Sequence, residues 1–274
     1  MTFHNIVFRF LGILILVSIT FESFGKTNLR GHGLADSWRT YKQLHATNPP
    51  AFQFKYDSCF RSAARRNDLP LTLLLAVARG ESDFNPRAIS KANAIGIMQI
   101  LWPGTAHDLG IKRKSDLFKP CTNIQAGARY LKFLVDRYSG DYNLAIAAYN
   151  YGPNRIKQNG SVHSIPKGAQ WYSSYIYDHL QYVLGQGSGI RKPPIQSPLP
   201  VYSELGRYSV IIFNKPFRAR AFREYLQSRL TNVRFDWFNK GLGRFEVVMM
   251  YNGRKEFRRN LNKLKALGIA LGPV

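Results

Sequence analysis

The sequence predicts an α+β protein with a mainly helical unit over residues 51–184 and a smaller mixed unit over residues 207–274. Apolar residues recur at helical spacing through the first unit, and no strong strand-like run interrupts them. Runs rich in β-branched and aromatic residues follow a stretch rich in glycine and proline, residues 185–206. This order of patterns predicts two units joined by a linker.

Residues 1–25 are typical of a secretory signal peptide. A positive charge precedes the apolar stretch Phe10–Ile19, and Ser23 and Gly25 place small residues at the recognition positions for cleavage. An uncleaved membrane anchor is the alternative, but the stretch is shorter than the roughly 20 residues that a membrane span requires. We therefore expect an exported protein of the periplasm or cell envelope, with membrane contact through the signal alone. Residues 26–50 are polar and are expected to form a loose N-terminal extension.

The helices expected in the first unit follow from apolar periodicity and from residues typical of helix ends. Asp57 or Ser58 is expected to cap the first helix, and Gly140 and Gly152 follow the ends of two later ones. The expected helices cover Asp57–Arg66, Leu69 or Pro70 to Asp83, Ile124–Tyr138, Tyr142–Tyr149 and Gln170–Leu184.

The second unit alternates strand-like and helix-like segments in the order β-α-β-β-α, which predicts a small ferredoxin-like sandwich. A hairpin is expected around Lys240–Gly243, and Ile269–Leu271 is a candidate final strand. The expected elements cover Tyr208–Phe213, Ala219–Leu230, Val233–Phe238, Phe245–Tyr251 and Arg254–Leu267.

Glu81 stands out because it is the only glutamate between residues 22 and 204 and lies at the end of an apolar run. On a helix it shares a stripe with Leu74, Val77 and Ala78, so its carboxyl is expected to point toward the packed side. Burial penalises the ionised form and raises the pKa toward neutrality. A carboxyl that holds its proton near neutral pH is suited to act as a general acid.

The formal charge of the chain is +23, which predicts an anionic partner. Nucleic acid, acidic lipid and an anionic cell-wall polymer are the candidates, and export disfavours nucleic acid. The hairpin over Lys240–Gly243 has an alternative interpretation as a strand motif of RNA-recognition folds, but Leu242, Arg244 and Val247 replace the aromatic residues needed for base stacking. The histidines show no metal-ligand spacing, so neither a metal nor another cofactor is expected.

Residues 52–182 resemble the soluble lytic transglycosylase family, which has a goose-lysozyme-like fold. The resemblance rests on motifs that occur in the family's order: Glu81–Pro86, Ala94–Gln99, Gly104–Ala106, Leu109–Gly110, Asn123–Ile124, Ala126–Gly127, Tyr130–Leu131 and Ala147–Pro153. It implies a lysozyme-like catalytic domain over residues 51–184 that acts on peptidoglycan glycan strands without a cofactor.

The resemblance also implies a reaction. Glu81 is expected to protonate the β-1,4 glycosidic oxygen between N-acetylmuramic acid and N-acetylglucosamine, and then to accept a proton from the muramoyl 6-hydroxyl. That hydroxyl attacks C1 and closes a 1,6-anhydro ring, so no water is consumed. The alternatives are a hydrolytic muramidase and a catalytically weak peptidoglycan-binding component of a cell-wall or secretion machine.

The positions of the acidic residues in the sequence also favour a reaction with a single catalytic acid. Most glycosidases place two carboxylates about 5 to 5.5 Å or 6.5 to 9.5 Å apart. Asp83 is the nearest carboxylate in sequence to Glu81, and on a continuous helix it faces roughly the opposite side. We therefore expect Asp83 to take no part in the reaction.

The resemblance implies roles in substrate binding for residues near Glu81. Ser82 is expected to steer the carboxyl, Gln99 to hold an acetamido group and Met98 to line the groove. Tyr149 is expected to hydrogen-bond the acid or the sugar, with core packing as the alternative for Tyr149 and Met98. Asn150 belongs to the same set, with support of the adjacent turn as its alternative role.

Two departures from the family concern the substrate groove. Asn93 stands where the pattern usually has glycine, but asparagine also adopts a left-handed backbone, so the turn is expected to survive. Segment 165–170 lacks the acidic residue that the family often has there, which indicates reduced activity or an adapted groove.

Cys59 and Cys121 are the two cysteines of the chain. An even pair in an exported protein predicts a disulfide, with two buried free thiols as the alternative. The pair also resembles the arrangement in transglycosylases attached to secretion and conjugation machines.

The second unit resembles the sporulation-related repeat that binds peptidoglycan, and this resemblance implies a peptidoglycan-binding module. Its basic side chains are candidates for contact with an anionic wall polymer, with an ordinary solvated face as the alternative: Lys215, Arg218, Arg220, Arg223, Arg254, Lys255, Arg258 and Arg259.

Overall fold

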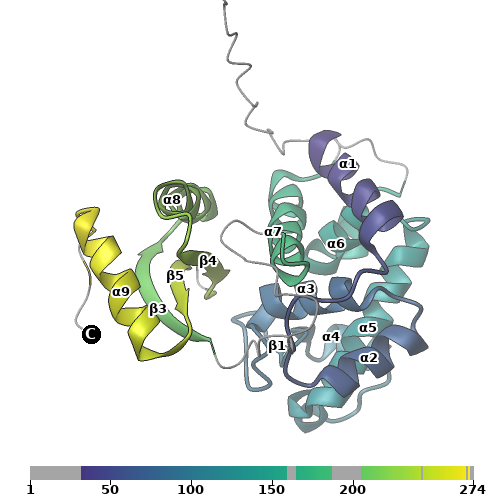
Figure 1. Ribbon diagram of the computed structural model, residues 1–274. Helices are drawn as coiled ribbons and strands as arrows, with labels where there is room; N and C mark the ends of the chain where they lie inside the picture. The colour runs from purple at the N-terminus through teal and green to yellow at the C-terminus, as the bar shows by residue number, and fades with distance from the viewer. Residues whose placement is uncertain (1–31, 159–164, 187–204, 242, 270, 272–274) are drawn as a thin grey trace, which may run out of the picture.

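The computed structural model describes residues 32–158, 165–186, 205–241, 243–269 and 271. A helical unit and a small unit with a sheet lie side by side (Figure 1). The expected signal peptide and nearly all of the expected linker lie outside the described residues. Among the helices that are described, none combines the length and the apolar character needed to cross a membrane.

The helical unit is built around α3, Leu71–Ser82. All residues from Thr72 to Gly80 are buried, which is typical of a helix packed on every side. Helix α7 (Lys167–Val183) packs along α3, and α6 (Tyr142–Tyr151) packs against α7. The remaining helices of this layer are α2 (Asp57–Arg66), which contacts α3, and α5 (Pro120–Arg137), which contacts α2 and α6.

The helix expected over Asp57–Arg66 is confirmed, whereas α5 and α7 begin earlier than expected. Pro120 and Pro166 mark these two starts, because the fixed φ angle of proline suits the beginning of a helix. Short elements connect the helices: β1 Ala94–Ile95, β2 Ile100–Leu101, α4 Gly104–Asp108, and 3-10 turns at Lys114–Phe118 and Pro153–Arg155. Asn93 has a φ of 64°, so the expected left-handed turn is present.

The prediction of a loose N-terminal extension was wrong for residues 32–45. Helix α1 (His32–Thr40) continues into a π-helical turn at Tyr41–His45. Trp38 and Tyr41 are buried in the core, where Trp38 Nε1 donates to Ser173 Oγ at 2.9 Å and Tyr41 Oη lies 2.8 Å from Thr72 Oγ1. A few large aromatic side chains therefore anchor a segment whose average composition is polar.

The small unit has the expected β-α-β-β-α order. Its elements are β3 Gly206–Phe213, α8 Pro216–Arg229, β4 Arg234–Asn239, β5 Phe245–Tyr251 and α9 Gly253–Ala266. The strands pair antiparallel in the order β3-β5-β4. Ile269 and Leu271 are not in a strand, and the residue between them lies outside the described part, so the candidate final strand is not observed.

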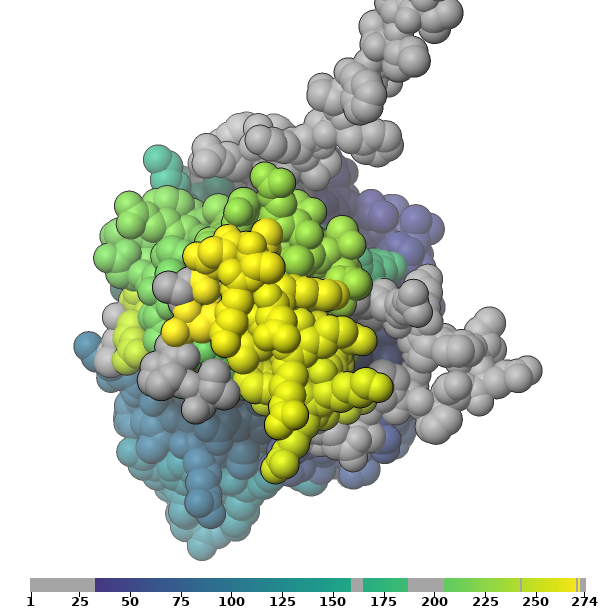
Figure 2. Space-filling view, turned by 60° about the vertical axis from the view of Figure 1, so that its left-hand side comes forward, coloured from purple at the N-terminus to yellow at the C-terminus, as the bar shows by residue number. Residues whose placement is uncertain are grey.

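The two faces of this sheet pack against different partners. Helices α8 and α9 lie on one side of the sheet and the helical unit on the other (Figure 1). Figure 2 looks onto the outer side of the small unit, where the yellow atoms of α9 face the viewer. Cross-strand partners share a face, so the register assigns these residues to the face toward the helical unit: Arg207, Ser209, Arg234, Asp236, Phe238, Glu246, Val248 and Met250.

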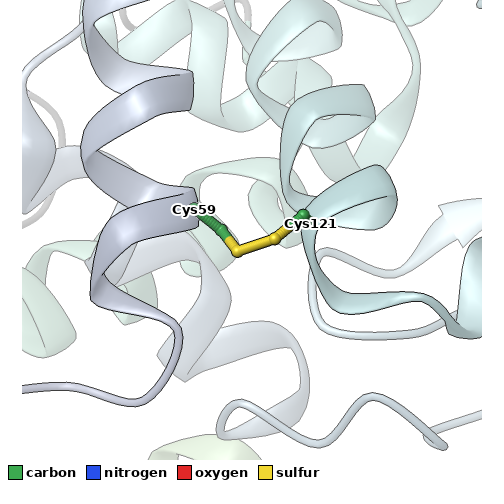
Figure 3. The surroundings of a disulfide bond; sticks show 2 residues. All are labelled: Cys59 and Cys121. Atoms are coloured by element: carbon green, nitrogen blue, oxygen red, sulfur yellow. A yellow bond between two sulfur atoms is a disulfide. The ribbon is translucent and has the colours of Figure 1, made fainter.

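A disulfide joins Cys59 in α2 to Cys121 in the first turn of α5 (Figure 3). The two Cα atoms lie 5.1 Å apart, within the usual range for a disulfide. The bond links α2, which precedes α3 in the sequence, to α5, which follows it.

Candidate active site

Glu81 lies in the last turn of α3, where the helix meets a large cavity. The helix ends because Asp83 and Phe84 take left-handed backbone angles, with φ of 53° and 61°. The end of the helix therefore leaves the Glu81 side chain at the wall of the cavity rather than inside the core, although most of its surroundings are packed.

The carboxyl of Glu81 accepts a hydrogen bond from the hydroxyl of Tyr172 in α7. Burial raises the pKa of Glu81 from its ordinary value of 4.5 to about 7, and the Tyr172 hydrogen bond offsets part of this rise. Burial and the nearby Glu81 raise the pKa of Tyr172 well above its ordinary value, so the hydroxyl remains a donor. The raised pKa expected from the sequence is therefore present, and Glu81 holds its proton close to neutral pH.

The cavity beside Glu81, here called the Glu81 cavity, has a volume of about 1910 Å³. Pockets for small molecules usually measure about 300 to 1,000 Å³. The Glu81 cavity is larger than that range, so its size suits a segment of a polymer. Residues from both units line it, and those from the helical unit include Glu81, Ser82, Asp83, Asn85, Gln99, Tyr149 and Asn150.

Gln99, Tyr149 and Asn150 line the cavity, but Tyr149 does not bond Glu81. The Tyr149 hydroxyl donates to the carbonyl oxygen of Met98 at 2.9 Å. Gln99 Nε2 donates to the carbonyl oxygen of Gly96 at 2.9 Å, and Asn150 is exposed. Tyr149 and Gln99 thus help to shape the wall from which Glu81 projects.

Two of the predicted site residues have structural roles instead. Ser82 Oγ donates to the Ile97 carbonyl oxygen at 2.8 Å and accepts from the Asn85 amide at 3.1 Å, so it fixes the loop rather than steering Glu81. The prediction that Met98 lines the groove was wrong: its exposure is 0%, and it is not among the residues that line the cavity. The Met98 amide donates to Asn123 Oδ1 at 2.7 Å, which holds this part of the loop against the core.

The predicted position of Asp83 on the opposite side of the helix was also wrong. Because the helix ends at Ser82, Asp83 turns out of the helical path and lines the same cavity as Glu81. Its carboxylate forms an ion pair with Arg207 of β3. Asp83 therefore connects the edge of the site to the small unit.

Sequence reasoning missed Tyr172, the residue that contacts the carboxyl of Glu81. The available signal was an aromatic stripe in α7, where Tyr172, Tyr175 and His179 recur at helical spacing. Such a stripe usually indicates core packing, and 91 positions separate Tyr172 from Glu81. Only the packing of α7 along α3 brings the two side chains together.

The family of this part of the chain follows from comparison with known proteins. Residues 58–171 match the family described as the transglycosylase SLT domain. This segment, less than half of the chain, is similar to that family and is called the SLT domain below. The SLT domain contains Glu81, Gln99, Tyr149 and both disulfide cysteines, whereas Tyr172 directly follows the match and the small unit lies beyond it.

Relatives of the SLT domain carry related names. The chain is 40% identical to the putative soluble lytic murein transglycosylase of Haemophilus influenzae over 37% of this chain and 18% of that protein. It is 36% identical to the membrane-bound lytic murein transglycosylase C of Mannheimia succiniciproducens over 46% of this chain and 38% of that protein. A solved structure of the 70 kDa soluble lytic transglycosylase of Escherichia coli matches 47% of this chain and 24% of that chain, with 28% identity and a TM-score of 0.42. The chain thus covers much less than two thirds of the length of each of these three proteins.

Proposed function

We propose that this protein is a peptidoglycan lytic transglycosylase, which cleaves the β-1,4 bond between N-acetylmuramic acid and N-acetylglucosamine and leaves 1,6-anhydromuramic ends. The observation that carries the proposal is a partly buried glutamic acid with a pKa of about 7, in the wall of a polymer-sized cavity of an SLT domain. The names of the relatives as murein transglycosylases support the same substrate.

The geometry supports a mechanism with one acid. Protonated Glu81 donates its proton to the glycosidic oxygen, and the bond between this oxygen and C1 of the muramoyl sugar breaks. The resulting carboxylate accepts the proton of the 6-hydroxyl as the hydroxyl oxygen bonds to C1, so Glu81 returns to its protonated form. The Tyr172 hydrogen bond stabilises the carboxylate between these steps and holds it in place.

The ion pair of Asp83 argues against a hydrolytic muramidase. An inverting muramidase needs a second carboxylate as the base for water, and a retaining one needs it as the nucleophile. Asp83 lines the cavity but pairs with Arg207, and such a pair weakens a carboxylate as a base and as a nucleophile. The raised pKa of Glu81, in the wall of the cavity, favours a catalytic role over a binding role alone, because perturbed pKa values cluster at functional sites.

Digestion of purified peptidoglycan followed by mass analysis of the products tests this function. Anhydro-muropeptides are expected from the wild type, and Glu81→Gln should fold and release none. Glu224→Gln is a matched control, because Glu224 is an exposed glutamate of α8 outside the cavity. Products with reducing ends identify a muramidase, and a wild type that releases nothing contradicts the proposal.

The proposed site of action is the cell envelope, where this substrate lies. The outer side of the small unit also supports contact with an anionic wall polymer, because four basic residues of α9 are exposed there: Arg254, Lys255, Arg258 and Arg259. Arg220 and Arg223, which were candidates for the same contact, instead approach Asp178 of α7 at 3.5 and 4.0 Å. If the polymer contact exists, retention of Glu81→Gln on wall sacculi should fall with added salt and with charge reversal on α9.

A further inference from the structure

We propose that the small unit forms the second wall of the substrate groove and that Lys240 and Glu246 on this wall bind sugar hydroxyl and acetamido groups of the glycan strand. The inference rests on the proposed function for the identity of the polymer. It assigns the small unit a place in the groove itself, rather than the role of a separate module on a linker.

The first support is the continuity of the Glu81 cavity across both units. The same cavity that Glu81, Gln99 and Asn150 line on the helical unit is closed on its other side by the sheet of the small unit. The lining residues of the small unit come from all three strands and from the turn after β4: Arg207, Ser209, Phe238, Asn239, Lys240, Gly241, Glu246 and Val248. A glycan strand that fills this cavity would therefore contact both Glu81 and the sheet.

The second support is a buried ion pair that fixes the small unit in position. Arg79 of α3 has an exposure of 0% and pairs with Asp236 of β4. The Arg79 guanidinium also lies 3.7 Å from the ring centroid of Tyr182 and 5.0 Å from that of Phe238 in β4. A shift of β4 that left the Arg79 guanidinium buried without its counter-charge would be strongly unfavourable, so the pair favours this position of the small unit.

The third support is a hydrogen-bonded link between the backbone next to Glu81 and the backbone next to Lys240. The Tyr175 hydroxyl donates to the carbonyl oxygen of Gly80 at 3.0 Å and accepts from the amide of Asn239 at 3.0 Å. Gly80 directly precedes Glu81, and Asn239 directly precedes Lys240. The buried Tyr175 hydroxyl thus holds two backbone segments in place: the one that carries Glu81 and the one that carries Lys240.

Aromatic packing makes this link rigid. Trp237 of β4 lies 4.9 Å from Tyr175 and 6.1 Å from Trp171 of α7, measured between ring centroids. Trp171 also contacts Phe245 of β5 at 5.6 Å. Aromatic pairs at these separations add to the stability of an interface beyond the area that they bury.

The chemistry of the wall fits a neutral polar polymer. Lys240 Nζ lies 3.3 Å from Glu246 Oε2, and the Lys240 side chain is 54% exposed, so the pair presents donors and an acceptor together. Sugar hydroxyl and acetamido groups both donate and accept hydrogen bonds, whereas a polyanion needs unbalanced positive charge. Arg207 on the same wall pairs with Asp83, so its charge is also balanced. The exposed basic residues of α9, Arg254, Lys255, Arg258 and Arg259, lie outside the cavity.

Binding of glycan strands to the full-length chain tests the inference without any need for turnover. Glu81→Gln serves as the parent, and the probe is a soluble peptidoglycan glycan strand from which the peptide stems have been removed. Lys240→Ala and Glu246→Gln, each in this parent, should raise the Kd about three- to tenfold, as expected for the loss of one hydrogen bond. Lys265→Ala is the matched control, because Lys265 is an exposed lysine of α9 that does not line the cavity.

The outcomes separate this inference from the proposed function. An unchanged Kd in both variants overturns the inference, even where the wild type releases anhydro-muropeptides. A Kd that depends on Lys240 and Glu246 supports it, even where the wild type proves inactive and the proposed reaction fails. Tighter binding by both variants, or faster cleavage when they are placed in the active protein, would show that the small unit obstructs the groove and would overturn the inference. Equal melting temperatures of the variants and the control exclude a loss of folding as the cause.

Discussion

Tyr172 in α7 donates its hydroxyl hydrogen bond to the carboxyl of Glu81 in α3. The two effects on Glu81 oppose each other, since burial raises its pKa while the Tyr172 hydroxyl stabilises the ionised form. The resulting pKa of about 7 leaves Glu81 able to give up a proton and to take one back near neutral pH. The pair therefore suits a reaction in which one carboxyl acts first as acid and then as base.

Tyr172→Phe should move the alkaline limit of activity to higher pH. Bond cleavage requires protonated Glu81, so the rate of the wild type should fall as the pH rises through about 7. Loss of the hydroxyl destabilises the carboxylate and raises the pKa of Glu81 further. The maximal rate should also fall about tenfold, because the carboxyl is no longer held in place. The measurement is the pH profile of anhydro-muropeptide release, with Tyr177→Phe as the control on the same helix, and an unshifted limit in Tyr172→Phe contradicts the prediction.

Glu81→Gln should be more stable than the wild type above neutral pH. The folded protein holds the Glu81 proton up to about pH 7, whereas the unfolded chain releases it near 4.5. The free energy of unfolding of the wild type therefore falls as the pH rises between these values, and glutamine has no such dependence. The difference should grow to about 1 to 3 kcal/mol at pH 8. Urea unfolding of both proteins at pH 4, 6 and 8 measures it, and a constant difference would show that Glu81 has an ordinary pKa.

Local patterns predicted much of the fold. The helix over Asp57–Arg66 and the β-α-β-β-α order of the small unit were confirmed because periodicity and helix-end residues encode them within a few positions. The helical segment 32–45 was missed because its average polarity concealed Trp38 and Tyr41. Their partners are Ser173 and Thr72, far away in the sequence. The docking of the small unit involves contacts between residues far apart in the sequence, such as the Arg79–Asp236 pair, which no local pattern reveals.

The site shows the same division between local and distant information. The burial of Glu81 was predictable because its neighbours along one helix determine it. The contact of Tyr172 with Glu81 was not predictable, because it joins two helices. Met98 was predicted to line the groove and Gln99 to bind sugar, but which of two consecutive loop residues faces the cavity depends on backbone angles. Gln99 has a φ of 50°, and this left-handed turn accompanies the burial of Met98 and the exposure of Gln99 to the cavity.

Replacement of both disulfide cysteines, Cys59→Ser with Cys121→Ser, should lower the free energy of unfolding by about 2 to 4 kcal/mol. The bond closes a long loop, with a sequence separation of 62, and so restricts the unfolded chain. The urea midpoint of the double variant should fall to that of the wild type under reducing conditions. A midpoint equal to that of the oxidised wild type contradicts the stabilising role.

Asp236→Ala should destabilise the protein by about 3 to 5 kcal/mol, because it leaves the buried guanidinium of Arg79 without its counter-charge. His179 lies 2.5 Å from the same guanidinium but cannot replace the carboxylate. Burial and the charge of Arg79 lower the pKa of His179 to about 3, so its ring is neutral at ordinary pH.

The matched control for Asp236→Ala is Glu224→Ala, which removes an exposed partner of Arg220 and should cost no more than about 1 kcal/mol. The double variant Arg79→Met with Asp236→Leu should recover much of the loss, since it removes both buried charges and keeps their volume. Thermal and urea unfolding measure the difference in the free energy of unfolding between the wild type and each of the three variants. If Asp236→Ala is no less stable than Glu224→Ala, the Arg79–Asp236 pair does not hold the small unit against the SLT domain, and the second wall of the groove loses its main anchor.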